Sequence, residues 1–211
     1  MIARIIFQPL EETLQLHFSR SPDSPQTRHL LTYILHISSH LLLFLPAFLP
    51  PILPVILPLL LPARYRQTTA PATLEAYLTY YIPLMSLNGI LEAFHASSAS
   101  PAQIARQARW MIGSSGAFAG GLWVLREARV GSTEQCLVYA SCLSMVVRIV
   151  YAGNHARQYF KKTLPIPITD ILPHPTILAI AAVGAAVVRR LNGVNVLLGV
   201  GGFGFITLAA L

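Results

Sequence analysis

Long apolar stretches without charge dominate the pattern of the chain. Residues 29–63 contain no Lys, Arg, Asp or Glu over 35 positions, and residues 76–91 and 135–147 are also uncharged. A helix needs about 20 apolar residues to cross the roughly 30 Å of bilayer hydrocarbon. The stretches are continuous, whereas the strands of a membrane β-barrel alternate apolar and polar residues. The pattern therefore predicts an all-α, polytopic transmembrane helix bundle.

Short polar linkers divide the chain into segments of helical length. SRSPDSPQ at 19–26 and SSASPAQ at 97–103 combine Ser and Pro, which are typical of turns. We therefore expect a single bundle over residues 1–211 with about six to seven helices. The predicted segments are 2–19, 27–62, 73–97, 107–125, 133–153, 175–190 and 193–211.

A proline-rich stretch, LPAFLPPILPVILPLLLP at 45–62, interrupts the second segment. Prolines recur every four residues from Pro46 to Pro62, and Pro51 is an additional one. Each proline lacks an amide hydrogen, so the carbonyl four residues earlier loses its helical partner. Unsatisfied carbonyl groups are costly in lipid. We therefore expect a regular helix from 27 to about 45, then a kinked or extended continuation that is sheltered by protein or lies at the membrane interface.

Polar side chains in the first segment recur at helical spacing. Arg4, Gln8 and Glu11 lie three or four positions apart, so they share one face of a helix whose opposite face is apolar. Ionisable residues in a membrane span usually face the bundle interior or a water-filled cavity. An ion pair of Arg4 with Glu11 or Glu12 that serves only the structure is the alternative interpretation.

Two later segments repeat this arrangement. Asn88 and Glu92 share a helix face in the third segment, and Arg148 lies on one side of the fifth with Ser141 and Ser144. Several helices with such polar faces can surround one wet cavity, which predicts a transporter for a polar cargo. Alternatively, Asn88 and Glu92 simply join two helices by hydrogen bonds.

Composition and charge narrow the functional classes. The chain is 54% hydrophobic and 11% charged, whereas soluble domains carry about 25% charged residues. Its net charge of +7 comes from basic residues between the apolar runs, so we expect membrane lipid and no nucleic acid as a partner. His36 and His40 have metal-like spacing without a third ligand, and no nucleophile–base pattern occurs. We expect neither an enzyme nor a metal or other cofactor.

Three stretches resemble the signature segments of the eukaryotic Man(5)GlcNAc(2)-PP-dolichol translocation proteins of the endoplasmic reticulum. They are IIFQPLEETLQLHFS at 5–19, LMSLNGILEAFHA at 84–96 and ASCLSMVVRIVYA at 140–152, and their order and spacing agree with the family. The matching residues are Arg4, Phe7, Gln8, Pro9, Glu11, Glu12, Phe18, Leu87, Asn88, Gly89, Glu92, Ala93, Phe94, Met145, Arg148 and Ile149. The chain departs from the family by having Ser141 and Ser144 where Asn is usual, and by its proline-rich stretch.

The resemblance covers most of this chain but only the carboxyl-terminal part of the family's protein. It implies the second half of a two-bundle fold of the multidrug/oligosaccharidyl-lipid/polysaccharide flippase type, in which one half rocks against the other. We therefore expect a partial chain whose missing partner is an amino-terminal bundle.

The resemblance also implies a cargo. A protein of this family would be a multi-pass protein of the endoplasmic reticulum membrane that translocates, or assists in translocating, dolichol-diphosphate-linked oligosaccharide for N-glycosylation. Arginine suits the diphosphate because its planar guanidinium offers a fork of donors, and amide and carboxyl groups suit sugar hydroxyls. The candidate substrate-binding residues are Arg4, Gln8, Glu11, Asn88, Glu92 and Arg148.

Two other functional classes remain open at this stage. A cation-coupled small-molecule exporter half would need an acidic residue that titrates during transport, and Glu92 is the first candidate. A non-transporting membrane assembly protein would need no such residue.

Overall fold

The chain folds into helices joined by short connections. The computed structural model describes residues 2–161, 166–190 and 199–202, excepting the side chains of 2–6 and 168, and these ranges contain no strand. The prediction of an all-α fold is confirmed for these residues. The elements are α1 (Ile2–Arg20), α2 (Pro25–Leu60), α3 (Ala63–Arg66), α4 (Ala70–Ala76), the π-helical turn η1 (Tyr77–Tyr81), α5 (Ile82–Ser98), α6 (Pro101–Glu127), α7 (Thr133–Phe160), the 3-10 turn η2 (Ile168–Asp170) and α8 (Pro175–Val188).

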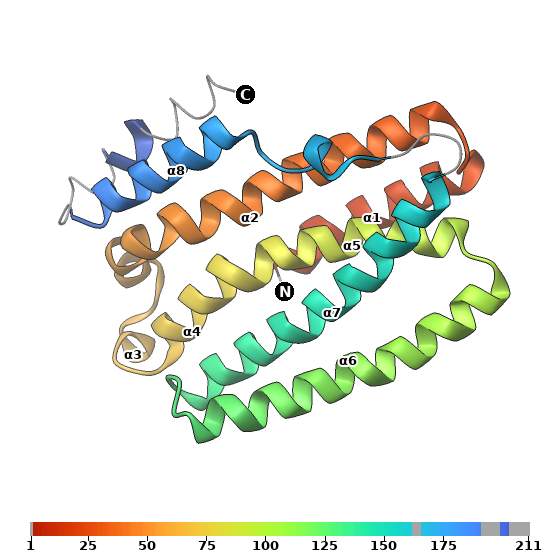
Figure 1. Cartoon of the computed structure of the whole chain (residues 1–211). Helices are drawn as coiled ribbons and strands as arrows, with labels where there is room; N and C mark the ends of the chain where they lie inside the picture. Colours follow the sequence, from red (N-terminus) through yellow and green to blue (C-terminus); the bar gives the residue numbers. More distant parts are fainter. Residues whose placement is uncertain (1, 162–165, 191–198, 203–211) are drawn as a thin grey trace.

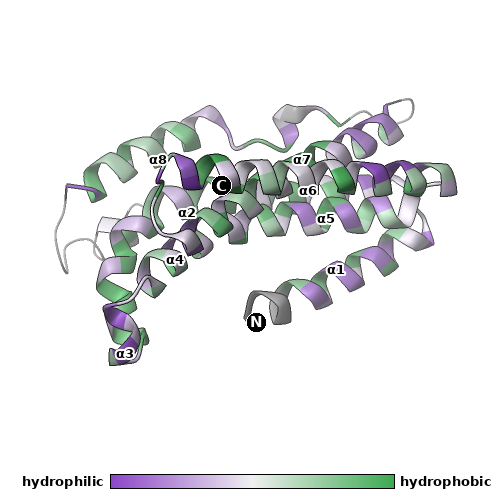
Figure 2. Ribbon diagram, turned by 90° about the horizontal axis from the view of Figure 1, so that it is seen from below, coloured by the Kyte–Doolittle hydropathy of each residue, from purple (hydrophilic) through white to green (hydrophobic). Residues whose placement is uncertain are grey.

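Three helices with family-like motifs lie next to one another. Helix α5 packs between α1 and α7, α6 packs along the outer side of α7, and α2 runs alongside α5 (Figure 1). Helix α8 packs on α2, and Figure 2 shows α1 on one side of the layer formed by the longer helices. The polar faces predicted for α1, α5 and α7 therefore belong to neighbouring helices.

Serine caps determine where the longer helices begin. The Ser24 hydroxyl accepts a hydrogen bond from the Thr27 amide at 3.1 Å. Ser132 and Gln135 form a capping box at the start of α7, in which each side chain accepts from the backbone amide of the other. Ser100 has the same arrangement before α6, with Pro101 at the first helical position. This cap explains why α6 begins at Pro101 and not at the predicted residue 107.

An aromatic cluster closes the bundle at the end where α1, α5 and α7 converge. The Phe94 ring of α5 stacks on Phe160 of α7 at 5.3 Å between centroids and meets Phe18 of α1 edge-on at 5.6 Å. All three side chains are buried. Aromatic pairs of this geometry add about 0.5–1.5 kcal/mol each beyond their burial, so this cluster fixes the relative positions of the three helices.

Helix α2 continues through five prolines to Leu60, so of the predicted kinked or extended continuations after residue 45 the extended one is wrong. Proline holds φ near the helical value, and membrane-type helices tolerate the freed carbonyls where neighbouring groups shelter them. Helix α8 covers this half of α2, burying Phe48 against Ala181 and Val188, which agrees with the expected shelter by protein. The helix ends at Leu60 because Pro62 favours an extended conformation at Leu61, whose ψ is 132°.

A second proline alters the helix that carries Asn88 and Glu92. Pro83 is buried and cannot donate to the carbonyl of Thr79. Immediately before it the helix widens into the π turn η1, where the Ile82 amide bonds to the Tyr77 carbonyl. Helix α4, η1 and α5 nevertheless continue without a break from Ala70 to Ser98. We attribute the π turn to Pro83.

Two described helices, α2 and α7, are long and apolar enough to cross a membrane. Helix α8 is apolar but has only 14 residues. Together with the all-helical fold, these helices indicate a membrane protein. The predicted segment 193–211 falls outside the described residues except at 199–202, so a seventh helix there stays a prediction.

Candidate functional site

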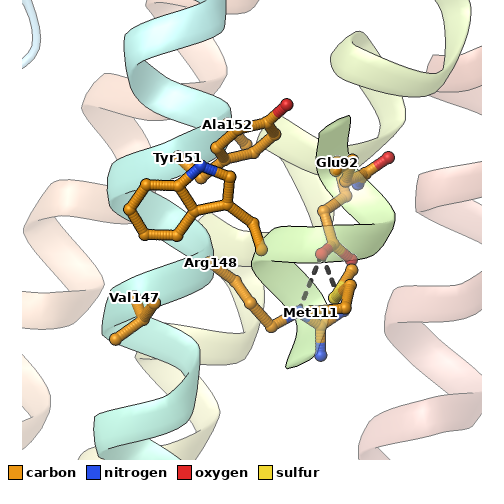
Figure 3. Close-up of a pocket in the computed structure, with 8 residues that line it drawn as sticks. Glu92, Met111, Val147, Arg148, Tyr151 and Ala152 are labelled. Atoms are coloured by element: carbon orange, nitrogen blue, oxygen red, sulfur yellow. Dashed lines mark hydrogen bonds and ion pairs between the residues drawn. The ribbon is translucent and has the colours of Figure 1, made fainter. Parts of the chain in front are cut away.

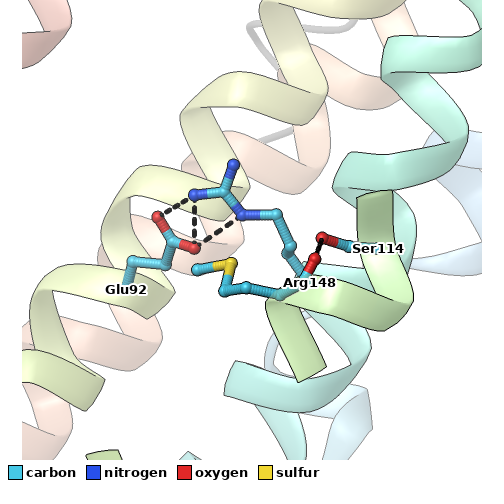
Figure 4. A network of polar contacts seen from close by, with 4 residues as sticks. Glu92, Ser114 and Arg148 are labelled. Carbon is cyan, nitrogen blue, oxygen red and sulfur yellow. Dashed lines mark hydrogen bonds and ion pairs between the residues drawn. The ribbon is translucent and has the colours of Figure 1, made fainter. Parts of the chain in front are cut away.

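Arg148 of α7 and Glu92 of α5 form a two-pronged ion pair between helices (Figure 4). Nε of Arg148 donates to Oε1 of Glu92 at 2.8 Å, and Nη2 donates to Oε2 at 2.7 Å. The two side chains are 31% and 25% exposed, respectively. Bidentate charge-assisted pairs are the strongest class of protein hydrogen bond. The pair therefore holds the Arg148 guanidinium in one orientation against α5.

Glu11 of α1 brings a second carboxylate to this pair. Gly89, one turn before Glu92 on α5, lies against the Glu11 side chain so closely that a Cβ at residue 89 would overlap the carboxylate. Glu11 interacts electrostatically with both Glu92 and Arg148. Three helices thus contribute to one charged cluster of Glu11, Glu92 and Arg148, and Glu12 of α1 adds a further carboxylate beside Glu11.

Asn88 occupies the same helix one turn before Glu92. Its side chain is 5% exposed, and its Oδ1 has no hydrogen-bond partner among the described residues. Leaving a buried acceptor unpaired costs about 1–3 kcal/mol. Such a group is available to a donor from a ligand or from water.

A small cavity borders the ion pair on the side of α6 (Figure 3). Glu92, Arg148 and Tyr151 line it, together with Met111 and Trp110 of α6, whose indole ring lies 5.4 Å from the Tyr151 ring. Its volume is about 10 Å³, which is close to the smallest cavity that holds one water molecule. The cavity is therefore too small for a sugar.

Gln8 and Arg4 are the other two predicted site residues. Gln8 is exposed and donates to Glu12 of its own helix at 3.0 Å, so it does not join the charged cluster in the described chain. The side chain of Arg4 lies outside the described residues. Of the six candidates, the structure brings together Glu11, Glu92 and Arg148, with Asn88 on the same helix as Glu92.

A histidine pair was not among the predicted site residues. The His95 side chain is fully buried, and neither ring nitrogen has a hydrogen-bond partner in the described part of the chain. Its ring lies 4.4 Å from that of His155, whose Nε2 is 3.0 Å from the Ser98 hydroxyl. Helical spacing in the sequence could have indicated this pair. His95 follows Glu92 by three residues and His155 follows Arg148 by seven, so each histidine shares a helix face with one member of the ion pair.

No metal centre emerges from these groups. Within residues 2–161, 166–190 and 199–202, no three His, Cys, Asp or Glu side chains lie close enough to hold a metal ion. His36 and His40 have adjacent rings, with centroids 4.5 Å apart, but Nδ1 of His40 is 2.8 Å from the His36 carbonyl oxygen.

Comparisons with known proteins agree with the motifs. The family model described as Rft protein matches residues 1–211. The Man(5)GlcNAc(2)-PP-dolichol translocation protein of Eremothecium gossypii is 32% identical over 168 residues, covering 77% of this chain and 30% of that relative. The proteins of the same name from Kluyveromyces lactis and Mus musculus are 31% and 23% identical, covering 91% and 89% of this chain and 36% of each relative.

The chain spans about a third of the length of these curated relatives. No solved structure matches it. Because the family model extends over every residue, the chain belongs to the Rft protein family.

Proposed function

We propose that the chain forms the carboxyl-terminal helices of a protein that translocates, or assists in translocating, dolichol-diphosphate-linked oligosaccharide. On this proposal it is a multi-pass protein of the endoplasmic reticulum membrane and serves N-glycosylation. The observation that carries the proposal is the meeting of Glu11, Glu92 and Arg148 from three separate helices. Relatives that are 32% and 31% identical to this chain are named for translocating this glycolipid.

Arg148 is the proposed contact for the diphosphate. Glu92 holds the guanidinium by the same two-pronged geometry that a phosphate would adopt. In the empty protein Glu92 thus acts as the counter-ion, and a diphosphate oxygen replaces it when cargo binds. Asn88 and Glu11 are proposed to bond sugar hydroxyls, and Arg4 and Gln8 of α1 stay predicted contacts for the cargo.

The proposed cargo needs a larger cavity than the one beside Arg148. The cavity beside Arg148 has room for about one water molecule, and the relatives are about three times as long as the matched region. We propose that this bundle is one half of a two-bundle flippase-type fold and that the cargo binds between the halves. Rocking of one half against the other would then expose the site to each side in turn.

The test uses a chimaera in which this chain replaces the matching segment of the Kluyveromyces lactis relative. Arg148→Gln in the chimaera should reduce N-glycosylation of a reporter protein at least about tenfold per unit of chimaera present in the membrane, because the variant loses a charge-assisted contact. Arg126→Gln, an exposed change in the last turn of α6, is the matched control. Full glycosylation with Arg148→Gln at normal protein level would refute the role of Arg148.

One observation favours the cation-coupled exporter as a second candidate. Glu11, its neighbour Glu12 and Glu92 outnumber the single guanidinium of Arg148, and a proton or metal cation could balance part of this excess negative charge. An exporter of this kind would lose coupling with Glu11→Gln while the Arg148→Gln variant still bound cargo. Proton-driven uptake measured in vesicles that contain the chimaera distinguishes the two candidates.

A further inference from the structure

A basic pocket opens at the end of the bundle, away from the ion pair. Its walls are Arg28 near the start of α2, Arg157 and Lys161 at the end of α7, and the buried Ile166, with further lining from Asn154, Gln158 and Pro167. The two helix ends meet at one end of the molecule, as Figure 1 shows. The pocket volume is about 680 Å³, within the roughly 300–1,000 Å³ of small-molecule sites.

Positive charge exceeds negative charge around this pocket. Arg28 faces Asp170 at 4.0 Å, the limit of an ion pair. Among the described residues, no carboxylate lies within ion-pair distance of Arg157 or Lys161. The nearby Asp23 accepts a hydrogen bond from the Tyr159 hydroxyl at 2.6 Å. The carboxylates of this end therefore do not neutralise the pocket.

The helix dipole does not account for these charges. Cations in the last turn of a helix offset its negative end, which is equivalent to about half an elementary charge. Arg157 and Lys161 bring two positive charges to the end of α7, and Arg28 brings a third that Asp170 balances. The half charge at the end of α7 therefore offsets only part of the charge of Arg157 and Lys161.

The position of the pocket suits a lipid headgroup. Helices α2 and α7 are the described helices that are long and apolar enough to cross a membrane, and the pocket lies at the start of α2 and the end of α7. Arg157 follows Arg148 by nine residues, which separates it from the ion pair by about 14 Å along α7. Basic pockets at the ends of membrane helices bind anionic headgroups, and Ile166 gives this one an apolar wall.

We propose that this pocket binds the phosphate group of an anionic membrane lipid at the headgroup level. Arg157 and Lys161 contact the phosphate oxygens, Arg28 closes the opposite wall, and the acyl chains follow the apolar surface of α2 and α7. The inference is independent of the proposed translocation, because it concerns a resident lipid and residues outside the charged cluster.

The test measures equilibrium binding to the purified 211-residue chain in detergent micelles by native mass spectrometry. The probes are dioctanoyl phosphatidic acid, inorganic phosphate and dioctanoyl phosphatidylcholine. Arg157→Gln with Lys161→Gln should weaken phosphatidic acid binding about 30-fold, the effect of two basic residues near an anionic lipid. The matched control, Arg106→Gln with Arg109→Gln, removes two exposed charges of α6 at the same end and should change binding less than about threefold.

The outcomes separate the alternatives. Saturable binding of phosphatidic acid alone, lost in the pocket variant, supports the proposal. If inorganic phosphate binds as tightly as phosphatidic acid and loses as much affinity in the pocket variant, the pocket binds phosphate and the lipid assignment is wrong. If both double variants lose the same affinity for phosphatidic acid, or if neither loses any, the pocket is not the binding site. If the double variant loses helical circular dichroism, the single Arg157→Gln variant decides, with an expected loss of about fivefold.

Discussion

Helix α7 carries two arginines, one with a carboxylate partner and one without a carboxylate partner among the described residues. Arg148, in the middle of the helix, is bound by both oxygens of Glu92 and lies beside a cavity for about one water molecule. Arg157, near its end, faces a pocket of about 680 Å³ without a carboxylate at ion-pair distance among the described residues. The charge of Arg148 is thus balanced by a carboxylate of the described chain, whereas the charge of Arg157 is not.

The difference follows from the surroundings of each charge. Within a membrane a lone guanidinium is costly, so it needs a counter-ion from the protein itself. At the headgroup level water and lipid phosphates are present, so an arginine there can stay unpaired until an external anion arrives. The comparison predicts that changes at the inner pair alter stability, whereas changes at the outer pocket alter binding.

The largest expected effect on stability comes from breaking the inner pair. Glu92→Gln should lower the free energy of unfolding by about 3 kcal/mol, because Arg148 would keep its charge without a counter-ion. Unfolding in detergent micelles, followed by circular dichroism, measures this change. Glu127→Gln, at the exposed end of α6, is the control and should shift the free energy by less than about 0.5 kcal/mol. Equal effects of the two changes would contradict the comparison.

Replacing the whole pair sharpens this point. Glu92→Leu with Arg148→Met removes both charges and should return the free energy of unfolding to within about 1 kcal/mol of the original, since apolar pairs often replace buried ion pairs without loss. A double variant as unstable as Glu92→Gln would show that the pair is needed for folding itself. The same unfolding measurement applies.

A smaller effect is expected at the contact between α1 and α5. Gly113→Ala, where the added methyl meets open space on α6, should stabilise the chain by about 0.5–1 kcal/mol because alanine favours a helix. Gly89→Ala should lose this gain, since its methyl would displace the Glu11 carboxylate. If both alanines stabilise the chain equally, Glu11 does not rest against Gly89 in solution.

The smallest expected effect on stability is at the outer pocket. Arg157→Gln with Lys161→Gln should change the free energy of unfolding by less than about 0.5 kcal/mol, because both side chains are exposed and lack ion pairs in the described chain. A loss close to that of Glu92→Gln would show that these cations stabilise the fold. Thermal unfolding at low and high salt checks the result, since exposed charges respond to screening.

The helical fold could be predicted because uncharged apolar runs leave few other structures possible in lipid. The path of α2 could not, because the cost of missing hydrogen bonds depends on what covers the freed carbonyls. Helix α8, far along the chain, packs on that half of α2. Sequence spacing identifies the orphaned groups but not the element that shelters them.

The candidate site could be predicted only in part for a similar reason. Helical spacing placed Glu92 and Arg148 on polar faces, and the structure pairs those faces across α5 and α7. Gln8 shares its predicted face with Glu11, yet only Glu11 reaches α5. Spacing defines a face without showing which part of it meets a neighbour. Likewise, Arg28 and Lys161 form one pocket only because the ends of α2 and α7 meet.

The most direct test of the central claim reverses the inner pair in the chimaera. Glu92→Arg with Arg148→Glu keeps one cation and one carboxylate between α5 and α7 but moves the guanidinium to the other helix. If Arg148 contacts the diphosphate, the reversed pair should restore protein level and stability relative to Glu92→Gln while N-glycosylation of the reporter stays at least about tenfold reduced. Recovery of glycosylation together with stability would contradict the account, because the pair would then serve only to join two helices.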